Sequence, residues 1–347
     1  MLGPSRDIHN GILELLGSLL KEGREKILSD ELIEYIVLDM HKNISTEQAI
    51  GDAHFLRKCS KGFLEESSIE RILCAAFIDV IRSPNVMPCV LRHVLWGLYR
   101  LTDFDNPIYY VFTSFSEDMA ALECLVGLLD DHPNKALPAM YVIGNLVASA
   151  LPELIEGLLR TPLLETMRKL LQTENTEEKL RIEIYWVLSN INQTDAGNVV
   201  TFAALYDILM ADLRDAPVDV KVEVIYVVRD SIRMEPEENA RKLVEEYDCI
   251  PLICELLSFP EGPVILTCLD ALDTLLAIGE NVAAEYTEQY LYNPYAVKIA
   301  ECGGLDSLKK MENDARAEQI IKDYFGEAYQ IFLSRKRGLA TKSARKI

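Results

Sequence analysis

An aromatic ring, an amide and a carboxylate at helical spacing are the residues of this chain best suited to binding chemistry. Trp186 and Asn190 lie four residues apart, and Glu183 lies three residues before Trp186, so on a helix all three share one side. An indole ring packs on the aliphatic stem of Lys or Arg and attracts its charge. The amide can pair with an extended peptide backbone, and the carboxylate can take the cationic head group. These three residues predict a site for a basic, extended peptide.

An aromatic residue followed four positions later by a polar residue recurs along the chain. The pairs are Trp96 with Arg100, Tyr141 with Asn145, Trp186 with Asn190, and Tyr226 with Asp230, the last preceded by Glu223. The aromatic residues are 45, 45 and 40 residues apart. Residues that stack one repeat on the next also recur, so a core role stays open beside the binding role.

The elements that must carry these pairs are helices. Apolar residues three and four apart dominate the chain, and no stretch shows sustained strand alternation. A period of 40–45 residues without strands is typical of armadillo or HEAT repeats. LLETMRKLL is predicted to be a middle helix, QTENTEEK a loop and LRIEIYWVLSNI the third helix, and CIPLICELL with LTCLDALDTLL follows the same order. We therefore predict an all-α chain whose third helices carry the aromatic–polar pairs.

Each unit has one apolar face, so neighbouring units are expected to stack into a solenoid with a concave groove. We count about seven units, with six between residues 45 and 290 and an atypical one from 293 to about 333. Residues 1–44 are predicted to be an N-terminal helical segment or cap. Residues 45–333 are predicted to form the solenoid, and residues 334–347 a disordered basic tail.

The charge balance argues against nucleic acid as a partner. Acidic residues number 55 and basic residues 35, a formal net charge of -20, whereas phosphate binding needs clustered Lys and Arg. Such a chain favours basic partners. No apolar run approaches the roughly 18–20 residues of a spanning helix, so no membrane insertion is expected. The eight cysteines lack paired spacing and are interpreted as free thiols of the cytoplasm or nucleus.

Several motifs together resemble importin α (karyopherin α), the adaptor family that binds nuclear localisation signals. YWVLSNI is similar to the Trp/Asn repeats of that family. CIPLICELL, LDALDTLLAIGE, NPYAVKIAECGGLDSLKKMEN and DYFG resemble its last three to four armadillo repeats in order and spacing. AHFLRKCSK (53–61) is a weaker match to its first repeat. The resemblance covers most of residues 45–330 and is specific from about residue 180 onward.

The resemblance implies a right-handed armadillo superhelix that binds Lys/Arg-rich signal peptides for nuclear protein import, in the nucleus and the cytoplasm. The family has a major site on early repeats and a minor site on later ones. The residues that match the minor site are Trp186, Asn190, its preceding acid Glu183, and Glu223 of the next repeat, where Tyr226 and Asp230 replace Trp and Asn. Nuclear export factors or nucleoporins at the C-terminal repeats are further partners that the resemblance implies.

Four departures from the family pattern stand out. Trp96 is followed by Arg100 where the family has Asn, and about seven units are present rather than ten, so we expect the major site to be lost or rebuilt. Residues 1–44 carry few bases among their acids, so importin β binding through this segment is not expected. The tail carries two basic clusters, SRKR and KSARK, which predict a groove-occupying segment or a solvated tail with no partner.

Alternative functions stay open at this point. One is an armadillo scaffold that has lost cargo binding and serves another protein–protein interaction. Another is a self-inhibited adaptor whose basic tail occupies the groove. An enzyme is disfavoured because GxxxxGK[ST], GxGxxG after a strand, HExxH and GxSxG are all missing from the sequence. We expect no catalytic residues, no metal ligands and no cofactor.

Overall fold

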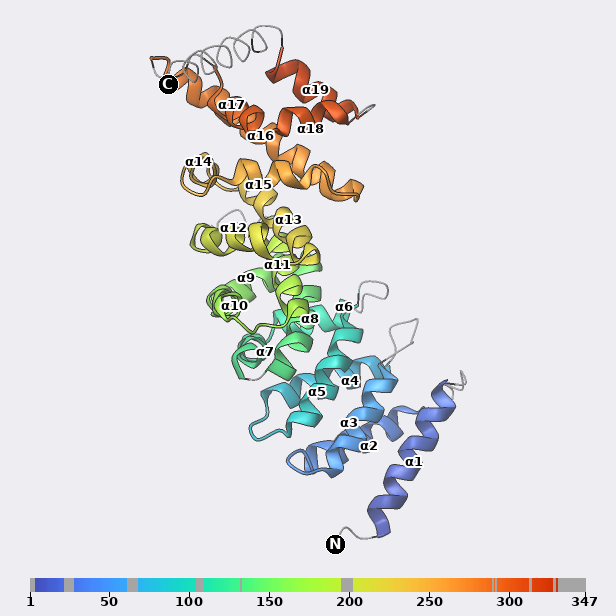
Figure 1. The fold of residues 1–347 in the computed structure, drawn as a ribbon. Coiled ribbons are helices and arrows are strands. Elements are labelled where there is room, and N and C mark those ends of the chain that lie inside the picture. Colours follow the sequence, from blue (N-terminus) through green and yellow to red (C-terminus); the bar gives the residue numbers. More distant parts are fainter. Residues whose placement is uncertain are drawn as a thin grey trace. The chain divides into compact units, whose positions relative to one another are not determined.

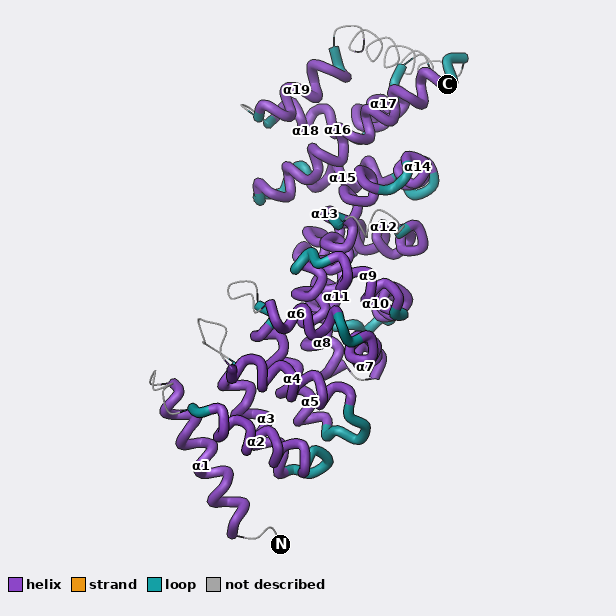
Figure 2. Tube along the Cα trace, turned by 180° about the vertical axis from the view of Figure 1, so that it is seen from behind, coloured by secondary structure: helices purple, strands orange, loops and turns teal. Residues whose placement is uncertain are grey.

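The computed structural model describes residues 4–21, 28–60, 68–103, 109–131, 133–194, 202–288, 290, 292–311, 314–326 and 329. Within these ranges the chain consists of helices and connecting loops without strands (Figure 1; Figure 2), which confirms the all-α prediction. It divides into two compact units, residues 1–196 and 197–347. The predicted tail, 334–347, lies outside the described residues, and the boundaries at 44 and 333 stay predictions.

The first unit contains two rows of helices that each follow the chain. Its helices are α1 (Pro4–Lys21), α2 (Asp30–Lys42), α3 (Gln48–Cys59), α4 (Ser68–Arg82), α5 (Pro88–Leu101), α6 (Tyr109–Ser116), α7 (Met119–Asp131), α8 (Pro133–Ala148), α9 (Pro152–Arg160), α10 (Leu163–Gln172) and α11 (Glu178–Asn192). Helices α3, α5, α8 and α11 pack in series, and α2, α4, α7 and α10 form the second row. The expected order of middle helix, loop and third helix is therefore confirmed at α10 and α11.

The sequence of α11 shows how these helices are positioned. The helix buries Ile184, Val187, Leu188 and Ile191 at 0% exposure. Burying an aliphatic side chain of this size stabilises the fold by roughly 1.5–3 kcal/mol relative to leaving it exposed. The spacing of three and four residues keeps this apolar side on the neighbouring helices. Trp186 lies off that side and is partly exposed.

The second unit repeats the same two-row arrangement. It contains the 3-10 helix η3 (Ala203–Leu205) and helices α12 (Tyr206–Asp215), α13 (Val218–Met234), α14 (Glu237–Glu245), α15 (Cys249–Leu256), α16 (Gly262–Glu285), α17 (Pro294–Glu301), α18 (Gly304–Lys310) and α19 (Ala315–Tyr324). Helices α13, α16 and α19 pack in series, with α12, α15 and α18 beside them. The predicted pairing of CIPLICELL with LTCLDALDTLL is thus confirmed as α15 and α16.

Helix α16 is longer and more apolar than the sequence analysis predicted. It has 24 residues with a mean hydropathy of 1.5 in its most apolar window, and among the described helices it alone meets the length and composition of a membrane span. More than half of that window, 56%, is buried inside the fold, against α13, α15, α17 and α19. These contacts make α16 the central core helix of the second unit.

Candidate functional site

Three successive helices of the first unit each present a partly exposed aromatic side chain. Trp96 on α5 and Tyr141 on α8 have ring centroids 5.7 Å apart. Tyr99, which the sequence analysis did not single out, lies one turn beyond Trp96 and approaches Tyr141 to 5.1 Å. Trp186 on α11 continues the series, and all four rings are partly exposed. We call Trp96, Tyr99, Tyr141 and Trp186 the aromatic row.

A glycine on α8 makes room for Trp186. A Cβ atom added at Gly144 would lie 2.5 Å from Cζ3 of Trp186 and 2.9 Å from Oε1 of Glu183, closer than real Cβ contacts. Glycine weakens the middle of a helix by roughly 0.5–1 kcal/mol relative to alanine. Its place in YVIGNLVAS was the available signal for this close contact, and the sequence analysis missed it.

Glu183 places a negative charge beside the aromatic row. Burial raises the pKa of Tyr141, and the charge of Glu183 raises it further. Burial, Asp103 and then Glu183 raise the pKa of Tyr99 in the same way. The carboxylate is thus close enough to act on two phenols of the row, and the predicted combination of acid and aromatic ring on one face is present.

The two asparagines predicted to bind peptide backbone differ in their surroundings. Asn145 is 8% exposed, and its Nδ2 donates to the carbonyl oxygen of Tyr99 at 3.2 Å and to the hydroxyl of Thr102 at 3.0 Å. Its amide therefore ties α8 to the end of α5. Asn190 is partly exposed, and its Nδ2 has no hydrogen-bond partner among the described residues. The Nδ2 atom of Asn190 is therefore buried and unpaired in this part of the structure, whereas that of Asn145 is used between helices.

In the second unit the corresponding side chains already contact an arginine of this chain. The guanidinium of Arg229 lies 5.6 Å from the ring centroid of Tyr226, and its Nε is 2.7 Å from Oδ1 of Asp230. Asp230 is 3% exposed. Glu223, one turn before Tyr226, is partly exposed, and burial raises its pKa. An internal cation thus takes the position that the sequence analysis assigned to a peptide side chain.

The next helix of that unit shows the same internal pairing. Asp270 on α16 forms ion pairs with Arg233 of α13 at 3.5 Å and with Arg316 of α19. Arg316 also lies 3.9 Å from Asp273. Asp270 is therefore paired with the chain's own arginines, as Asp230 is, which the local pattern around each aromatic residue did not reveal.

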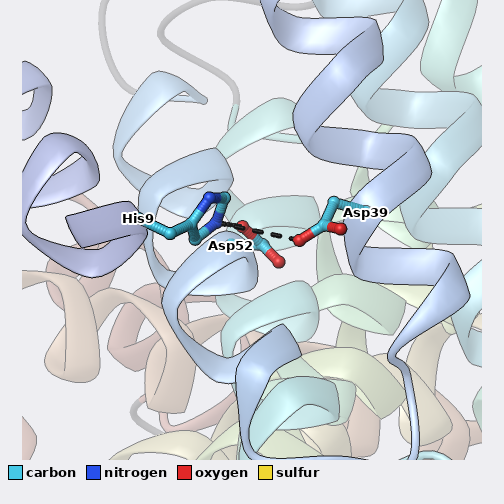
Figure 3. A group of neighbouring side chains, drawn as sticks. All are labelled: His9, Asp39 and Asp52. Atoms are coloured by element: carbon cyan, nitrogen blue, oxygen red, sulfur yellow. Dashed lines mark hydrogen bonds and ion pairs between the residues drawn. The ribbon is translucent and has the colours of Figure 1, made fainter. Parts of the chain in front are cut away.

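A separate polar cluster joins the first three helices of the first unit (Figure 3). Nε2 of His9 on α1 lies 2.7 Å from Oδ1 of Asp52 on α3 and 3.8 Å from Oδ2 of Asp39 on α2. Burial raises the pKa of Asp52 to about 6, although the hydrogen bond with His9 lowers it. The donor atoms lie within 4.8 Å of one another, a spacing that could hold a cation. The short bond between His9 and Asp52 gives the cluster a structural role in fastening α1.

Comparisons with known proteins place these observations in a family context. No family model matches the chain. Importin subunit alpha-8 of Arabidopsis thaliana is 26% identical over 205 residues, 58% of this chain and 44% of that protein. Importin subunit alpha-4 of the same plant is 26% identical over 255 residues, 69% of this chain and 44% of that protein. The resemblance to importin α is therefore confirmed, although the chain spans less than half the length of these relatives.

Solved structures agree on the fold. A designed armadillo repeat protein in complex with the peptide (KR)4 superposes with a TM-score of 0.54 at 21% identity, over 71% of this chain and 99% of that one. A computationally designed armadillo repeat protein for modular peptide recognition gives 0.56 at 22% identity, over 72% and 98%. The chain is an armadillo-repeat protein similar to importin α.

Proposed function

We propose that this importin-α-like chain binds extended Lys/Arg-rich peptides on the aromatic row of its first unit, as an adaptor for nuclear protein import. The observation that carries the proposal is the combination of three features on α11. The Trp186 ring is partly exposed, Glu183 places its charge beside the row, and the Asn190 amide has an unpaired donor among the described residues.

The proposed contacts follow from the chemistry of each side chain. The stem of a peptide Lys or Arg packs on the Trp186 ring, which attracts the charge it carries. The head group reaches Glu183 in a charge-assisted hydrogen bond. Nδ2 of Asn190 donates to a peptide carbonyl, which satisfies a buried donor that is costly to leave unpaired. Trp96 and Tyr141 provide further apolar contacts, with Asn145 holding the helices beneath them.

The second unit contributes a weaker site in this proposal. Glu223, Tyr226 and Asp230 lie on one helix, α13, but a peptide cation must displace Arg229 from both Tyr226 and Asp230. Displacement costs an ion pair and a cation–π contact, so binding here is weaker than at Trp186. The first unit therefore determines affinity.

The relatives and structural neighbours support this choice of ligand. The relatives are named as importin α subunits, and one solved armadillo protein holds a peptide of alternating Lys and Arg. By analogy, cargo signal peptides are the proposed partners, and the nucleus and cytoplasm the proposed compartments. Nuclear export factors or nucleoporins are proposed for the C-terminal repeats on the same analogy.

The test is fluorescence polarisation of a labelled Lys/Arg-rich peptide with the full chain and with a chain lacking residues 334–347, at two salt concentrations. A matched peptide with Gln in place of the bases is the control. Salt-sensitive binding of the basic peptide supports the proposal. Tighter binding after removal of the tail would show that the tail competes with the peptide for the aromatic row. An absence of binding by both chains rejects the adaptor function.

A second candidate function is a scaffold that has lost cargo binding and holds another protein. The internal pairing of Arg229 with Tyr226 and of Arg316 with Asp270 favours it, because these contacts occupy the acidic and aromatic surface that a basic peptide needs. This scaffold predicts no preference between the basic peptide and its neutral control.

A further inference from the structure

Three arginines gather where α3 meets α5, at one end of the aromatic row. Arg57 lies on α3, and Arg92 and Arg100 lie on α5, four residues before and after Trp96. This spacing puts the two α5 arginines and the Trp96 ring on one side of the helix. Nη1 of Arg100 donates to the carbonyl oxygen of Arg57 at 2.9 Å. The two helices are therefore in direct contact within this group, which we call the arginine cluster.

Two histidines lie beside the cluster and do not neutralise it. The rings of His54 on α3 and His93 on α5 stack with their centroids 5.0 Å apart. Burial, followed by the charge of Arg57, lowers the pKa of His93 to about 4, so this ring is neutral at pH 7. Nδ1 of His93 and Nε of Arg57 are buried without a hydrogen-bond partner among the described residues.

Within the described part of the chain, no ion pair joins Arg57, Arg92 or Arg100 to an acidic side chain, although the charges of Asp103 and Glu183 reach the neighbouring Tyr99. The ion pairs there use other arginines, among them Arg82, Arg229, Arg241 and Arg316. Burial and the neighbouring charges of Arg100 and Arg92 lower the pKa of Arg57. Like charges held together are destabilising, and this chain has 55 acids for 35 bases. Three arginines without an ion pair among the described residues therefore favour a ligand that supplies negative charge.

We infer that the arginine cluster binds an acidic stretch of an extended protein segment, through Asp or Glu carboxylates. Guanidinium groups bind carboxylates in two-pronged, charge-assisted hydrogen bonds. The Trp96 ring between Arg92 and Arg100 gives such a segment an apolar surface to lie on. The site rests on α3 and α5 alone and does not depend on the basic-peptide site proposed on α11.

The aromatic row connects the two sites and sets their separation. Helices α5, α8 and α11 pack in series, and neighbouring helix axes lie roughly 8–10 Å apart. Two such steps span roughly 16–20 Å, and an extended chain covers about 3.3 Å per residue. A partner that fills both sites therefore carries acidic residues, then about five or six spacer residues, then basic residues.

The experiment compares four labelled peptides by fluorescence polarisation with the full chain. One has six acidic residues, six neutral spacers and six basic residues, and a second has the same composition in scrambled order. The third and fourth keep only the acidic or only the basic block, with neutral residues elsewhere. The variant is Arg92→Glu, because Arg92 is exposed and its replacement leaves the packing intact. Arg160→Glu, an exposed position on α9, changes the net charge equally and is the control.

We expect the ordered peptide to bind at least about tenfold more tightly than the basic-block peptide. Arg92→Glu removes this gain, whereas Arg160→Glu keeps it. The inference also stands if the acidic-block peptide binds, Arg92→Glu abolishes that binding, and the basic-block peptide does not bind. That result would reject the proposed function and leave the inference intact. The inference is overturned when the ordered, scrambled and basic-block peptides bind equally, or when both variants lose the same affinity.

Discussion

The guanidinium of Arg229 lies over the ring of Tyr226, 5.6 Å from its centroid, while its Nε contacts the carboxylate of Asp230 at 2.7 Å. One arginine of the chain thus makes the two contacts that the site on α13 would offer to a peptide lysine. Among the described residues of the first unit, no arginine or lysine lies over the Trp186 ring in this way. This difference makes the two parts of the candidate site unequal and gives the first prediction.

Replacing Arg229 should strengthen basic-peptide binding by the second unit. Arg229→Gln removes the internal cation, so Tyr226 and Asp230 become available to a ligand. We expect affinity for a Lys/Arg-rich peptide to rise roughly two- to fivefold, in line with about 0.5–1 kcal/mol for the cation–π contact that a peptide no longer has to displace. Arg214→Gln, an exposed position on α12, is the matched control. Equal affinities of Arg229→Gln and wild type would show that α13 takes no part in binding.

Gly144→Ala should displace Trp186. The new methyl group would lie 2.5 Å from the indole, so the ring must move, at a cost of about 1–3 kcal/mol in the free energy of unfolding. Peptide affinity should fall because the ring leaves the row. Tryptophan emission and urea unfolding report both effects. Gly127→Ala on α7, where a Cβ meets nothing within 4 Å, should instead leave stability unchanged or raise it by up to about 1 kcal/mol.

The two asparagines should separate stability from binding. Asn145→Ala removes the hydrogen bonds that the amide donates to the Tyr99 carbonyl and to the Thr102 hydroxyl, and it should destabilise the first unit by about 1–3 kcal/mol. Asn190→Ala removes a donor without a partner among the described residues, so it should cost less stability while weakening peptide binding. Chemical denaturation and peptide titration of both variants test this difference. An Asn190→Ala protein as unstable as Asn145→Ala would assign Asn190 to the core.

Asp52 should make stability depend on pH. Its pKa is about 6 in the fold and 3.8 in the reference state, so the folded chain keeps a proton that the unfolded chain has lost. Stability therefore falls as pH rises from about 4 to about 6. The groups that face Asp52 are His9 and Asp39.

Asp52→Asn keeps an acceptor for His9 and removes this titration. Between about pH 4 and pH 6, the free energy of unfolding of the variant should rise relative to that of wild type by on the order of 1–3 kcal/mol. Urea unfolding at pH 4, 5, 6 and 8 measures this difference. Asp79→Asn, an exposed position on α4, should follow the wild-type profile. A constant difference between Asp52→Asn and wild type at all four pH values would contradict the assignment.

Local patterns were sufficient to predict the helices and their order. The spacing of Ile184, Val187, Leu188 and Ile191 predicted a buried side of α11, and the fold buries all four. Helix α16 (Gly262–Glu285) extends beyond the predicted LTCLDALDTLL at both ends, because the apolar spacing continues to the buried Ile278 and Val282. The shared face of Trp186, Asn190 and Glu183 also followed from spacing alone.

The surroundings of each site residue could not be predicted in the same way. Arg229 and Tyr226 are one turn apart, but their contact depends on a rotamer that spacing does not specify. Arg316 is 46 residues beyond Asp270, and only the packing of α19 on α16 brings them together. Asn145 and Asn190 each follow an aromatic residue by four positions. Asn145 donates to the Thr102 hydroxyl and the Tyr99 carbonyl, whereas Asn190 has no corresponding acceptors among the described residues.

The central claim is that Trp186 and Asn190 hold a basic peptide, and a double variant tests it most directly. Trp186→Ala/Asn190→Ala is titrated with a labelled Lys/Arg-rich peptide beside wild type and beside Tyr35→Ala, which removes a 61% exposed aromatic ring on α2. We predict a loss of at least roughly 30-fold in the double variant, about 2 kcal/mol, and none in Tyr35→Ala. Unchanged affinity in a folded double variant would contradict the account.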